Sequence, residues 1–462
     1  MRPQKRIRAA AAALAGLVLV GTGAIAYGLD SGSTSNPATA TFLPALPPAV
    51  SSAPPSARAT TQPGASTSPS PGPTGSVTGG GDPVFASPVA TSACQGRLRR
   101  QCYSPAQYQA AYDLAPLYAR GITGAGRTIV IVDSFGSPTL QHDLDAYDRQ
   151  WNLPPLQVKI EKWGDVPAFD PTSSAMMGWA VETTMDVESA HAIAPGAAIV
   201  LIETAVAETE GTVGVPEMMD ALKRDVDAGR GDVVSMSWGT SEGQFAGFQN
   251  GDYTSLTGLR YAFQDAVQHD VTLLASSGDG GGSQGLDASW PAGDPLVTAI
   301  GGTALRLDDN GARVLPDTAW SGSGGSTSKD FPRPAYQNSI TNVTGDHRLV
   351  PDISMSASPD QAFWIYCTAD PSRAGWTADG GGTSLSSPLF AGIVALADQA
   401  VGHRLGQIDT QIYRLAAAHS PGIVDVTTGS NGPSGFTAGP GYDQATGVGT
   451  VDGAAFVKAL GG

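Results

Sequence analysis

Charged side chains are scarce in this chain of 462 residues. Asp, Glu, Lys and Arg together make up 15% of the sequence, and 42 acids against 26 bases leave a formal net charge of −16 at pH 7. An acidic chain repels the phosphates of nucleic acids, which argues against a DNA- or RNA-binding function. We therefore expect no nucleic-acid partner, and a surface whose acidic residues keep the protein soluble and suit a low pH.

Cysteine is almost absent as well. The chain has three, at positions 94, 102 and 367, and no spacing typical of a metal site. Cys94 and Cys102 are close enough in sequence to form a local disulfide that would leave Cys367 unpaired, although three pairings are open. We expect these cysteines to be structural.

The N-terminal region predicts export. Basic residues at positions 2–8 precede an apolar run from Ala9 to Tyr27 that contains Ala-Ile-Ala just before its end. This pattern is typical of a secretory signal peptide at 1–26, cleaved after Ala26. The run is also long enough for a membrane anchor. We expect a secreted, extracellular protein, attached to the cell surface only if this segment is retained.

Residues 27–93 are rich in Pro, Ser, Thr, Ala and Gly. So few apolar side chains cannot offset the entropy lost on folding, so we expect a disordered linker. The folded part then comprises residues 94–462 as one continuous domain.

Apolar strand-like runs alternate with helix-like segments in this part, which favours an α/β fold. The helix-like segments include 216–228 and 253–269, and the strand-like runs are 127–136, 197–204, 232–239 and 271–279. We expect a mostly parallel central sheet with helices on both faces, in three layers. Sites in such sheets lie beyond the carboxyl ends of the strands, where Asp133, Ser237 and Asp279 occur.

A helix-like stretch around residues 178–191 carries two acids on one face. Glu182 and Asp186 are one turn apart and share a mostly small or apolar stripe with Ala175 and Trp179. Taken alone, the pair could be an ordinary solvated Glu and Asp. Like charges on an inward face are costly, which makes a chemical function worth considering.

The segment DGGGTSLSSPLFAGIVALADQA at 379–400 carries the sharpest signal. Its glycines allow close approach of another backbone, and Ser384 falls at the start of an apolar helix, where the helix N-terminus favours negative charge. We expect Pro388 in the first turn, where its missing N–H costs least. The alternative is a serine that merely caps the helix.

Together with SMSWG at 235–239, ASSGDGG at 275–281 and the Glu/Asp helix, the GGTSLSSP motif resembles the sedolisin family of serine-carboxyl peptidases, whose fold is similar to subtilisin. The resemblance covers the chain from about residue 102 to its end. The remaining matching motifs, in the family's order, are VTAIGGT at 297–303, FPRPAYQ at 331–337 and RLVPDIS at 348–354.

The resemblance implies that Ser384 is the nucleophile, Glu182 its general base, Asp186 the acid that orients this base, and Asp279 the oxyanion-hole acid. A serine hydroxyl needs a base and the base needs an orienting partner, so these roles are chemically coherent. Two close carboxyls share a proton, and Asp279 must be protonated to donate a hydrogen bond. Both requirements for a bound proton favour acid conditions. Asp133 is expected to support the pair from behind.

The loop at 425–450 carries acids at both ends and glycines between them, a source of the oxygen ligands that calcium prefers. The resemblance implies one structural Ca²⁺ held by two carboxylates and three carbonyls. These ligands are Asp425, Val426, Gly439, Gly441 and Asp443. The alternative from the residues alone is an acidic surface loop with Asx turns.

Two segments resemble the edges that pair with a peptide substrate through main-chain hydrogen bonds: 321–326, and the residues Ser237, Trp238 and Gly239. Trp238 and Trp290 fit the core as well as a pocket wall. We expect a monomer acting on peptide or protein substrates. The sequence does not decide between internal cleavage and release of tripeptides, nor which side chains are preferred beside the cleaved bond.

Two alternatives to an acid-acting peptidase stay open. One is a neutral subtilisin-like protease, although the HGTH helix of subtilisin is absent and His191 lies on the opposite side of its helix from Glu182, about 180° around it. The other is an inactive surface binding module of the same fold. The polar stretch between Ala26 and Cys94 is too short for the large folded propeptide common in the family, which leaves control of activity open.

Overall fold

The computed structural model describes residues 83–208, 214–282, 287–340 and 345–461. The predicted signal peptide or anchor at 1–26 and most of the predicted linker lie outside these residues. Phe85 is already buried, and its backbone exchanges hydrogen bonds of 2.8 and 3.2 Å with that of Trp376. Packed structure therefore begins ahead of Cys94, because an apolar side chain in the last part of the predicted linker finds a partner.

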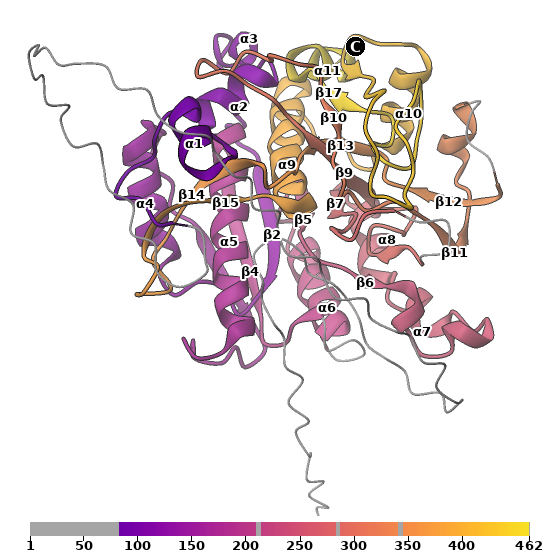
Figure 1. Ribbon diagram of the computed structural model, residues 1–462. Coiled ribbons are helices and arrows are strands. Elements are labelled where there is room, and N and C mark those ends of the chain that lie inside the picture. Colours follow the sequence, from indigo (N-terminus) through magenta and orange to yellow (C-terminus); the bar gives the residue numbers. More distant parts are fainter. Residues whose placement is uncertain (1–82, 209–213, 283–286, 341–344, 462) are drawn as a thin grey trace, which may run out of the picture.

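An eight-stranded sheet forms the middle layer (Figure 1). Its strands are β2 Thr128–Ser134, β3 Lys159–Trp163, β4 Ala198–Thr204, β5 Val233–Met236, β7 Thr272–Ser276, β9 Thr298–Ala304, β10 Thr318–Ala319 and β13 Ile353–Ser356. They lie in the order β10-β9-β7-β5-β2-β4-β3, with β13 also beside β9. β10 runs antiparallel to β9 and the other pairs are parallel. The four predicted strand runs correspond to β2, β4, β5 and β7, so the mostly parallel sheet is confirmed.

Helices cover both faces of this sheet, with α5 and α9 on one face and α6 and α8 on the other. The α-helices of the described residues are α1 Thr91–Leu98, α2 Pro105–Ala111, α3 Ala115–Tyr118, α4 Leu140–Trp151, α5 Ser174–Ile193, α6 Gly214–Asp227, α7 Thr254–Thr257, α8 Tyr261–Gln268, α9 Gly382–Val401, α10 Asp409–Ala417 and α11 Gly453–Leu460. The apolar helix α9 is long enough to cross a membrane, but most of its side chains are buried in the domain, as in a core helix.

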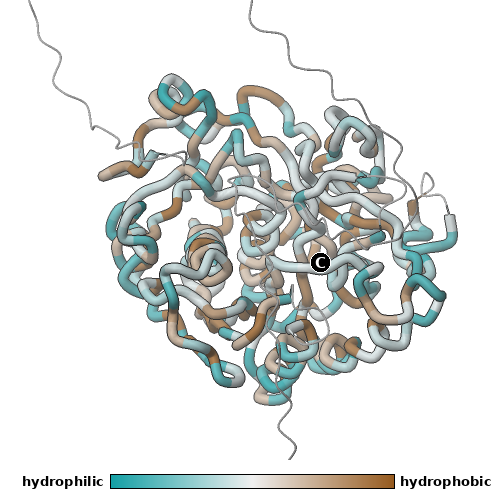
Figure 2. The backbone as a smooth tube through the Cα atoms, turned by 60° about the horizontal axis from the view of Figure 1, so that its bottom comes forward, coloured by the Kyte–Doolittle hydropathy of each residue, from teal (hydrophilic) through white to brown (hydrophobic). Residues whose placement is uncertain are grey.

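Strand β2 explains why two layers of helices are needed. Its side chains alternate, so Ile129 and Ile131 face one side of the sheet and Val130 and Val132 the other. The first pair belongs to the core that contains α5 and α9, and the second to the core that contains α6 and α8. Apolar segments accordingly gather toward the middle of the molecule, with many hydrophilic ones at its periphery (Figure 2). The predicted three-layer α/β fold is confirmed.

The predicted helix at 253–269 is wrong in one respect, since it is broken into α7 and α8. Gly258 lies at the break, and glycine costs a helix interior about 1 kcal/mol relative to alanine. The following amides turn more tightly: Leu259 donates to the carbonyl of Leu256 at 3.0 Å, and Arg260 donates to that of Thr257 at 3.3 Å. These three-residue hydrogen bonds end the α-helical ladder.

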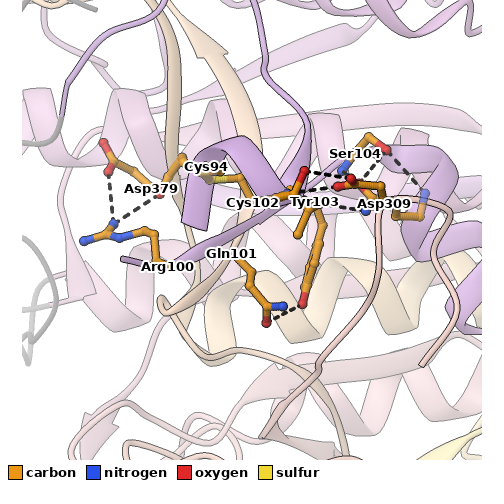
Figure 3. The surroundings of a disulfide bond; sticks show 12 residues. Cys94, Arg100, Gln101, Cys102, Tyr103, Ser104, Asp309 and Asp379 are labelled. Atoms are coloured by element: carbon orange, nitrogen blue, oxygen red, sulfur yellow. Dashed lines mark hydrogen bonds and ion pairs between the residues drawn. A yellow bond between two sulfur atoms is a disulfide. The ribbon is translucent and has the colours of Figure 1, made fainter. Parts of the chain in front are cut away.

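A small second sheet braces the segment that leads to Ser384. It consists of β1 Gln101–Tyr103, β14 Gln361–Cys367 and β15 Gly375–Gly380, in that order. A disulfide between Cys94 and Cys102 ties α1 to β1, and Arg100 reaches Asp379 of β15 at 4.0 Å (Figure 3). The local bridge is thus the one formed, while Cys367 is free and buried.

The remaining strands form three short pairs away from the main sheet. They are β6 Thr240–Ser241 with β8 Ser289–Trp290, β11 Ser326–Pro332 with β12 His347–Val350, and β16 Ile423–Val424 with β17 Thr450–Val451.

Candidate active site

The turn between β15 and α9 places Ser384 in the first turn of α9. Gly382 has φ +78°, and a side chain there would lie 2.5 Å from Oδ2 of Asp279. Only glycine fits both the left-handed backbone and the close approach of the acid. The glycine-rich segment is therefore needed to bring Ser384 and Asp279 together.

Pro388 differs from the expectation, because α9 already begins at Gly382 and the proline lies inside it. A proline has no N–H, so the carbonyl of Ser384, four residues earlier, loses its helical partner. The hydroxyl of Ser237 donates to this carbonyl at 3.1 Å. In return, the Ser384 hydroxyl donates to the carbonyl of Ser237 at 3.3 Å. This exchange holds the first turn of α9 against the end of β5.

Helix α5 brings Glu182 and Asp186 toward Ser384 on α9. Helices α5 and α9 approach each other closely where Gly392 of α9 faces Ile193 of α5. A Cβ at Gly392 would lie 2.6 Å from the Cβ of Ile193. Asp186 is fully buried, and neither of its oxygens nor Oε1 of Glu182 has a hydrogen-bond partner among the described residues.

Burial sets the protonation of this pair. It raises the pKa of Glu182 to about 8. The Ser384 side chain lowers this pKa, and the neighbouring acids Asp133 and Asp279 raise it further. Burial, together with Asp133 and Glu182, also raises the pKa of Asp186 well above its usual range. Carboxyls this close titrate together, so the pair holds protons in common.

Asp133 is the last residue but one of β2 and is completely buried. Burial raises its pKa to about 7, which the hydroxyl of Thr183 partly opposes. Its charge acts on both Glu182 and Asp186, so Asp133 lies near both acids.

Asp279 follows β7 on the other side of Ser384. Its Oδ1 accepts hydrogen bonds from the amide and the hydroxyl of Thr383, at 2.7 and 2.9 Å. Burial raises the pKa of Asp279, and these two bonds counteract part of the rise. The loop at 321–326 lies against this turn, since Gly324 donates to the carbonyl of Gly278 at 2.7 Å.

Two further acids near the site were not predicted from the sequence. Glu203 stands opposite Asp133 in the register of β4 with β2, and Glu208 lies shortly after β4. Both are buried, and the charges of both raise the pKa of Asp133. The charge of Glu208 also raises the pKa of Glu182. Their position after an apolar parallel strand was the available signal, because such strands end at the same edge.

Histidines take no part in the arrangement. Nε2 of His191 lies 3.2 Å from Asp148 and 3.0 Å from the carbonyl oxygen of Pro154. The part of the chain that the structure describes includes all six histidines, and in it no hydrogen bond or ion pair joins a histidine to Ser384 or Glu182. The geometry therefore favours the carboxyl pair over a histidine-based triad.

The predicted substrate edge is placed beside Ser384 but is largely covered. Ser237 and Gly239 are buried, and a side chain at Gly239 would meet the hydroxyl of Ser289 at 2.4 Å. Trp238 is a core residue, because its indole donates to the carbonyl of Val132 at 2.8 Å. Its side chain is not a pocket wall, and neither is the buried Trp290.

The C-terminal loop gathers the residues predicted to bind calcium. The amide of Gly441 donates to Oδ2 of Asp425 at 2.8 Å, and that of Gly439 to Oδ2 of Asp443 at 2.9 Å. The carbonyls of Val426, Gly439 and Gly441 accept no hydrogen bond from the described residues. No cluster of three or more His, Cys, Asp or Glu side chains suited to a metal occurs in those residues either. A cation here would thus depend on the free carbonyls, which fit calcium as hard oxygen ligands.

Known proteins resemble the chain over most of this region. A model of the subtilase family matches residues 174–427, more than half of the chain. Kumamolisin from Bacillus sp. (strain MN-32) is 29% identical over 383 residues, which cover 78% of this chain and 63% of the relative. Sedolisin from Pseudomonas sp. (strain 101) is 28% identical over 377 residues, covering 76% and 60%. The chain thus spans about three fifths of the length of these relatives.

The solved structure of Pseudomonas sedolisin, a serine-carboxyl proteinase complexed with two molecules of pseudo-iodotyrostatin, superposes with a TM-score of 0.67 at 26% identity. The match covers 79% of this chain and 100% of that one. Tripeptidyl-peptidase 1 from Bos taurus is 32% identical over 228 residues, which cover 42% of this chain and 38% of the relative. The chain therefore belongs to the subtilase family, and the relatives that it resembles over most of its length are sedolisin-type serine peptidases.

Proposed function

We propose that this protein is an acid-acting serine-carboxyl peptidase that hydrolyses peptide bonds in peptide or protein substrates. One observation carries the proposal: the half-buried Glu182 lies close enough to Ser384 for the serine side chain to lower its pKa, with the buried Asp186 one helical turn further on. A hydroxyl beside a base that is itself held by a third group is the arrangement that nucleophilic catalysis requires.

In the proposed reaction, Oγ of Ser384 attacks the substrate carbonyl carbon while its proton passes to Glu182. The C–N bond then breaks, and the amine leaves with that proton. Water attacks the resulting ester in the same way and restores the serine. Asp186 and Asp133 would act on Glu182 through their charge and through the proton that close carboxyls share.

Asp279 stabilises the oxyanion in this proposal. Its Oδ1 is occupied by Thr383, which leaves Oδ2, beside Gly382, to hold a proton and donate it to the developing charge. An ionised Asp279 would repel the oxyanion instead. Activity thus requires one proton on Asp279, which favours acid solution, and no more than one proton in the pair, because Glu182 must be free to accept that of Ser384.

Hydrolysis of a denatured protein between pH 3 and 8 tests the function. We expect cleavage in acid that Ser384→Ala abolishes and that Glu182→Gln lowers by at least about 10³-fold. A neutral optimum that is insensitive to Glu182→Gln would point to a histidine-based protease. Absence of cleavage at every pH, with the protein folded, would favour an inactive binding module. Peptide fragments identified by mass spectrometry would separate internal cleavage from tripeptide release.

We propose further that one structural calcium ion binds the C-terminal loop. The carboxylates of Asp425 and Asp443 and the carbonyls of Val426, Gly439 and Gly441 would hold it. When bound, the ion would cross-link the two ends of the loop; the reaction itself does not need it.

We also propose that the protein is exported through residues 1–26. The Cys94–Cys102 disulfide supports this proposal, because such bonds persist in oxidising compartments. N-terminal sequencing of protein from the culture medium tests it. A start at Tyr27 indicates a cleaved signal peptide, and retention of the first 26 residues in the membrane fraction indicates an anchor.

A further inference from the structure

Glu188 is a buried acid that the proposed chemistry does not use. It lies on α5 about 120° around the helix from Glu182, and its side chain is completely inaccessible to solvent. Oε2 accepts one hydrogen bond, from the amide of Tyr366 in β14 at 3.1 Å. Oε1 has no partner among the residues that the structure describes. A carboxylate in this position would lack most of the hydrogen bonds that stabilise its charge.

The surroundings of Glu188 are acidic. Helix α4 contributes Asp143 and Asp148, whose charges both act on Glu188. It also contributes Tyr147, whose hydroxyl has no hydrogen-bond partner in the part of the chain that the structure describes. On α5 itself, the nearby His191 already pairs with Asp148 at 3.2 Å. His142 on α4 likewise pairs with Asp143, at 3.0 Å. Among the described residues, the charges that act on Glu188 are thus those of acids, with no lysine or arginine to balance them.

The third neighbouring element, β14, adds no positive charge either. Cys367, the last residue of β14, has a buried thiol, and the charge of Glu188 helps to raise the pKa of this thiol. The next residue, Thr368, gives both its amide and its hydroxyl to Asp143, at 2.9 and 2.6 Å. These bonds join β14 to α4, with Glu188 enclosed between them.

Burial raises the pKa of Glu188 well above its usual range, and the charges of Asp143 and Asp148 on α4 add a smaller rise. The folded protein therefore binds a proton at Glu188 more tightly than the unfolded chain does. Stability from this source is fully present below the unfolded pKa of about 4.3 and is lost as the pH rises from there toward the folded pKa.

We propose that Glu188 is a pH sensor that locks α5 against α4 and β14 while it is protonated and loosens these contacts as the solution becomes neutral. The lock does not depend on the reaction assigned to Ser384. Its consequence for catalysis rests on the proposed function, because α5 also carries Glu182 and Asp186. Neutral pH would then disturb the position of the catalytic acids as well as their protonation.

The melting temperature of Glu188→Gln, measured between pH 4 and 7, tests the sensor. We expect the fall in Tm of the full-length wild type over this range to shrink by about 3 °C or more in the variant. Hydrogen exchange, corrected for its intrinsic pH dependence, should show that α4 and β14 lose protection toward neutral pH in the wild type and keep it in the variant.

A matched control is Glu242→Gln. Glu242 is also completely buried, and burial raises its pKa to about 7. Its carboxyl accepts hydrogen bonds from Ser328 and Lys329 of β11, and not from α4 or β14. Its substitution should flatten the Tm profile without protecting α4 and β14.

Glu188→Met serves as the second variant, since the slope of Tm against pH matters rather than the absolute Tm. If Glu188→Gln and Glu188→Met both keep the wild-type slope, or if α4 and β14 are protected equally at both pH values in the wild type, the proposal is wrong. Neither result depends on peptidase activity.

Discussion

Gly392 of α9 and Ile193 of α5 approach so closely that a Cβ at Gly392 would lie 2.6 Å from that of Ile193. Real Cβ atoms do not come this near one another, so a larger residue must push the helices apart. The contact lies between the two helices that carry Ser384 and Glu182. The distance between nucleophile and base is thus set partly by a glycine two helical turns away.

Gly392→Ala should therefore lower activity more than stability. Overpacking of this kind costs about 1–3 kcal/mol, and a small displacement of the reacting groups can cost on the order of 100-fold in rate. Denaturant unfolding and kcat of the same preparation measure the two effects.

The control for this variant is Gly178→Ala on α5, where a Cβ meets nothing within 4 Å. Alanine should stabilise this helix by about 0.5–1 kcal/mol and leave the rate unchanged. Equal rates in Gly392→Ala and the wild type would show that the helix spacing does not position the site.

Ser237→Ala should loosen the first turn of α9. It removes the hydroxyl that replaces the N–H missing at Pro388, which leaves the carbonyl of Ser384 unpaired at a cost of about 1–3 kcal/mol. We expect kcat to fall roughly tenfold or more. Ser235→Ala is the comparison, because Ser235 also joins β5 to α9, through Ser387 at 2.8 Å, but does not touch Ser384. Similar kcat values for the two variants would contradict the positioning role.

Asp279→Asn should change the alkaline side of the pH profile. Burial raises the pKa of Asp279. The required proton is therefore present below this raised pKa and lost as the pH rises through it. Asparagine keeps a donor that does not titrate, so we expect the alkaline fall in kcat/KM to move to higher pH, with a lower maximum. Asp279→Ala should lose about 10²–10³-fold at every pH. An unchanged alkaline limb in Asp279→Asn would remove Asp279 from the oxyanion role.

Calcium removal should lower the Tm of the wild type. Chelation releases an ion that binds only the folded loop, and stabilisation by such a ligand grows with its concentration above Kd. Asp443→Asn should melt at the same temperature with and without calcium. Asp346→Asn, which alters an exposed acid outside the loop, should keep the wild-type response. A wild-type Tm that is indifferent to calcium would count against the site.

The sheet and the main acids could be predicted from the sequence because each rests on a local pattern. Apolar strand runs mark β2, β4, β5 and β7, with Asp133 near the end of β2 and Asp279 shortly after β7. The one-turn spacing of Glu182 and Asp186 likewise requires only a helix. Fold class and the candidate acids therefore followed from periodicity, strand ends and the family motifs.

Features that depend on tertiary contact could not be predicted in this way. Glu208 adjoins the site only because the segment after β4 folds back toward Asp133. Trp238 is adjacent to a site residue in sequence, yet its indole turns into the core toward Val132. Pro388 resembles a first-turn proline until the start of α9 at Gly382 is known. In the first two cases the partner lies far away in the sequence.

Covalent labelling of Ser384 tests the central claim, that Glu182 activates this hydroxyl, without dependence on a particular substrate. The folded protein is treated with a fluorophosphonate in acid, and the labelled peptide is identified and timed by mass spectrometry. The wild type should be labelled at Ser384, and Glu182→Gln should be labelled at least about 100-fold more slowly while its Tm stays near that of the wild type. Equal labelling rates, or labelling only at other residues, would contradict the account.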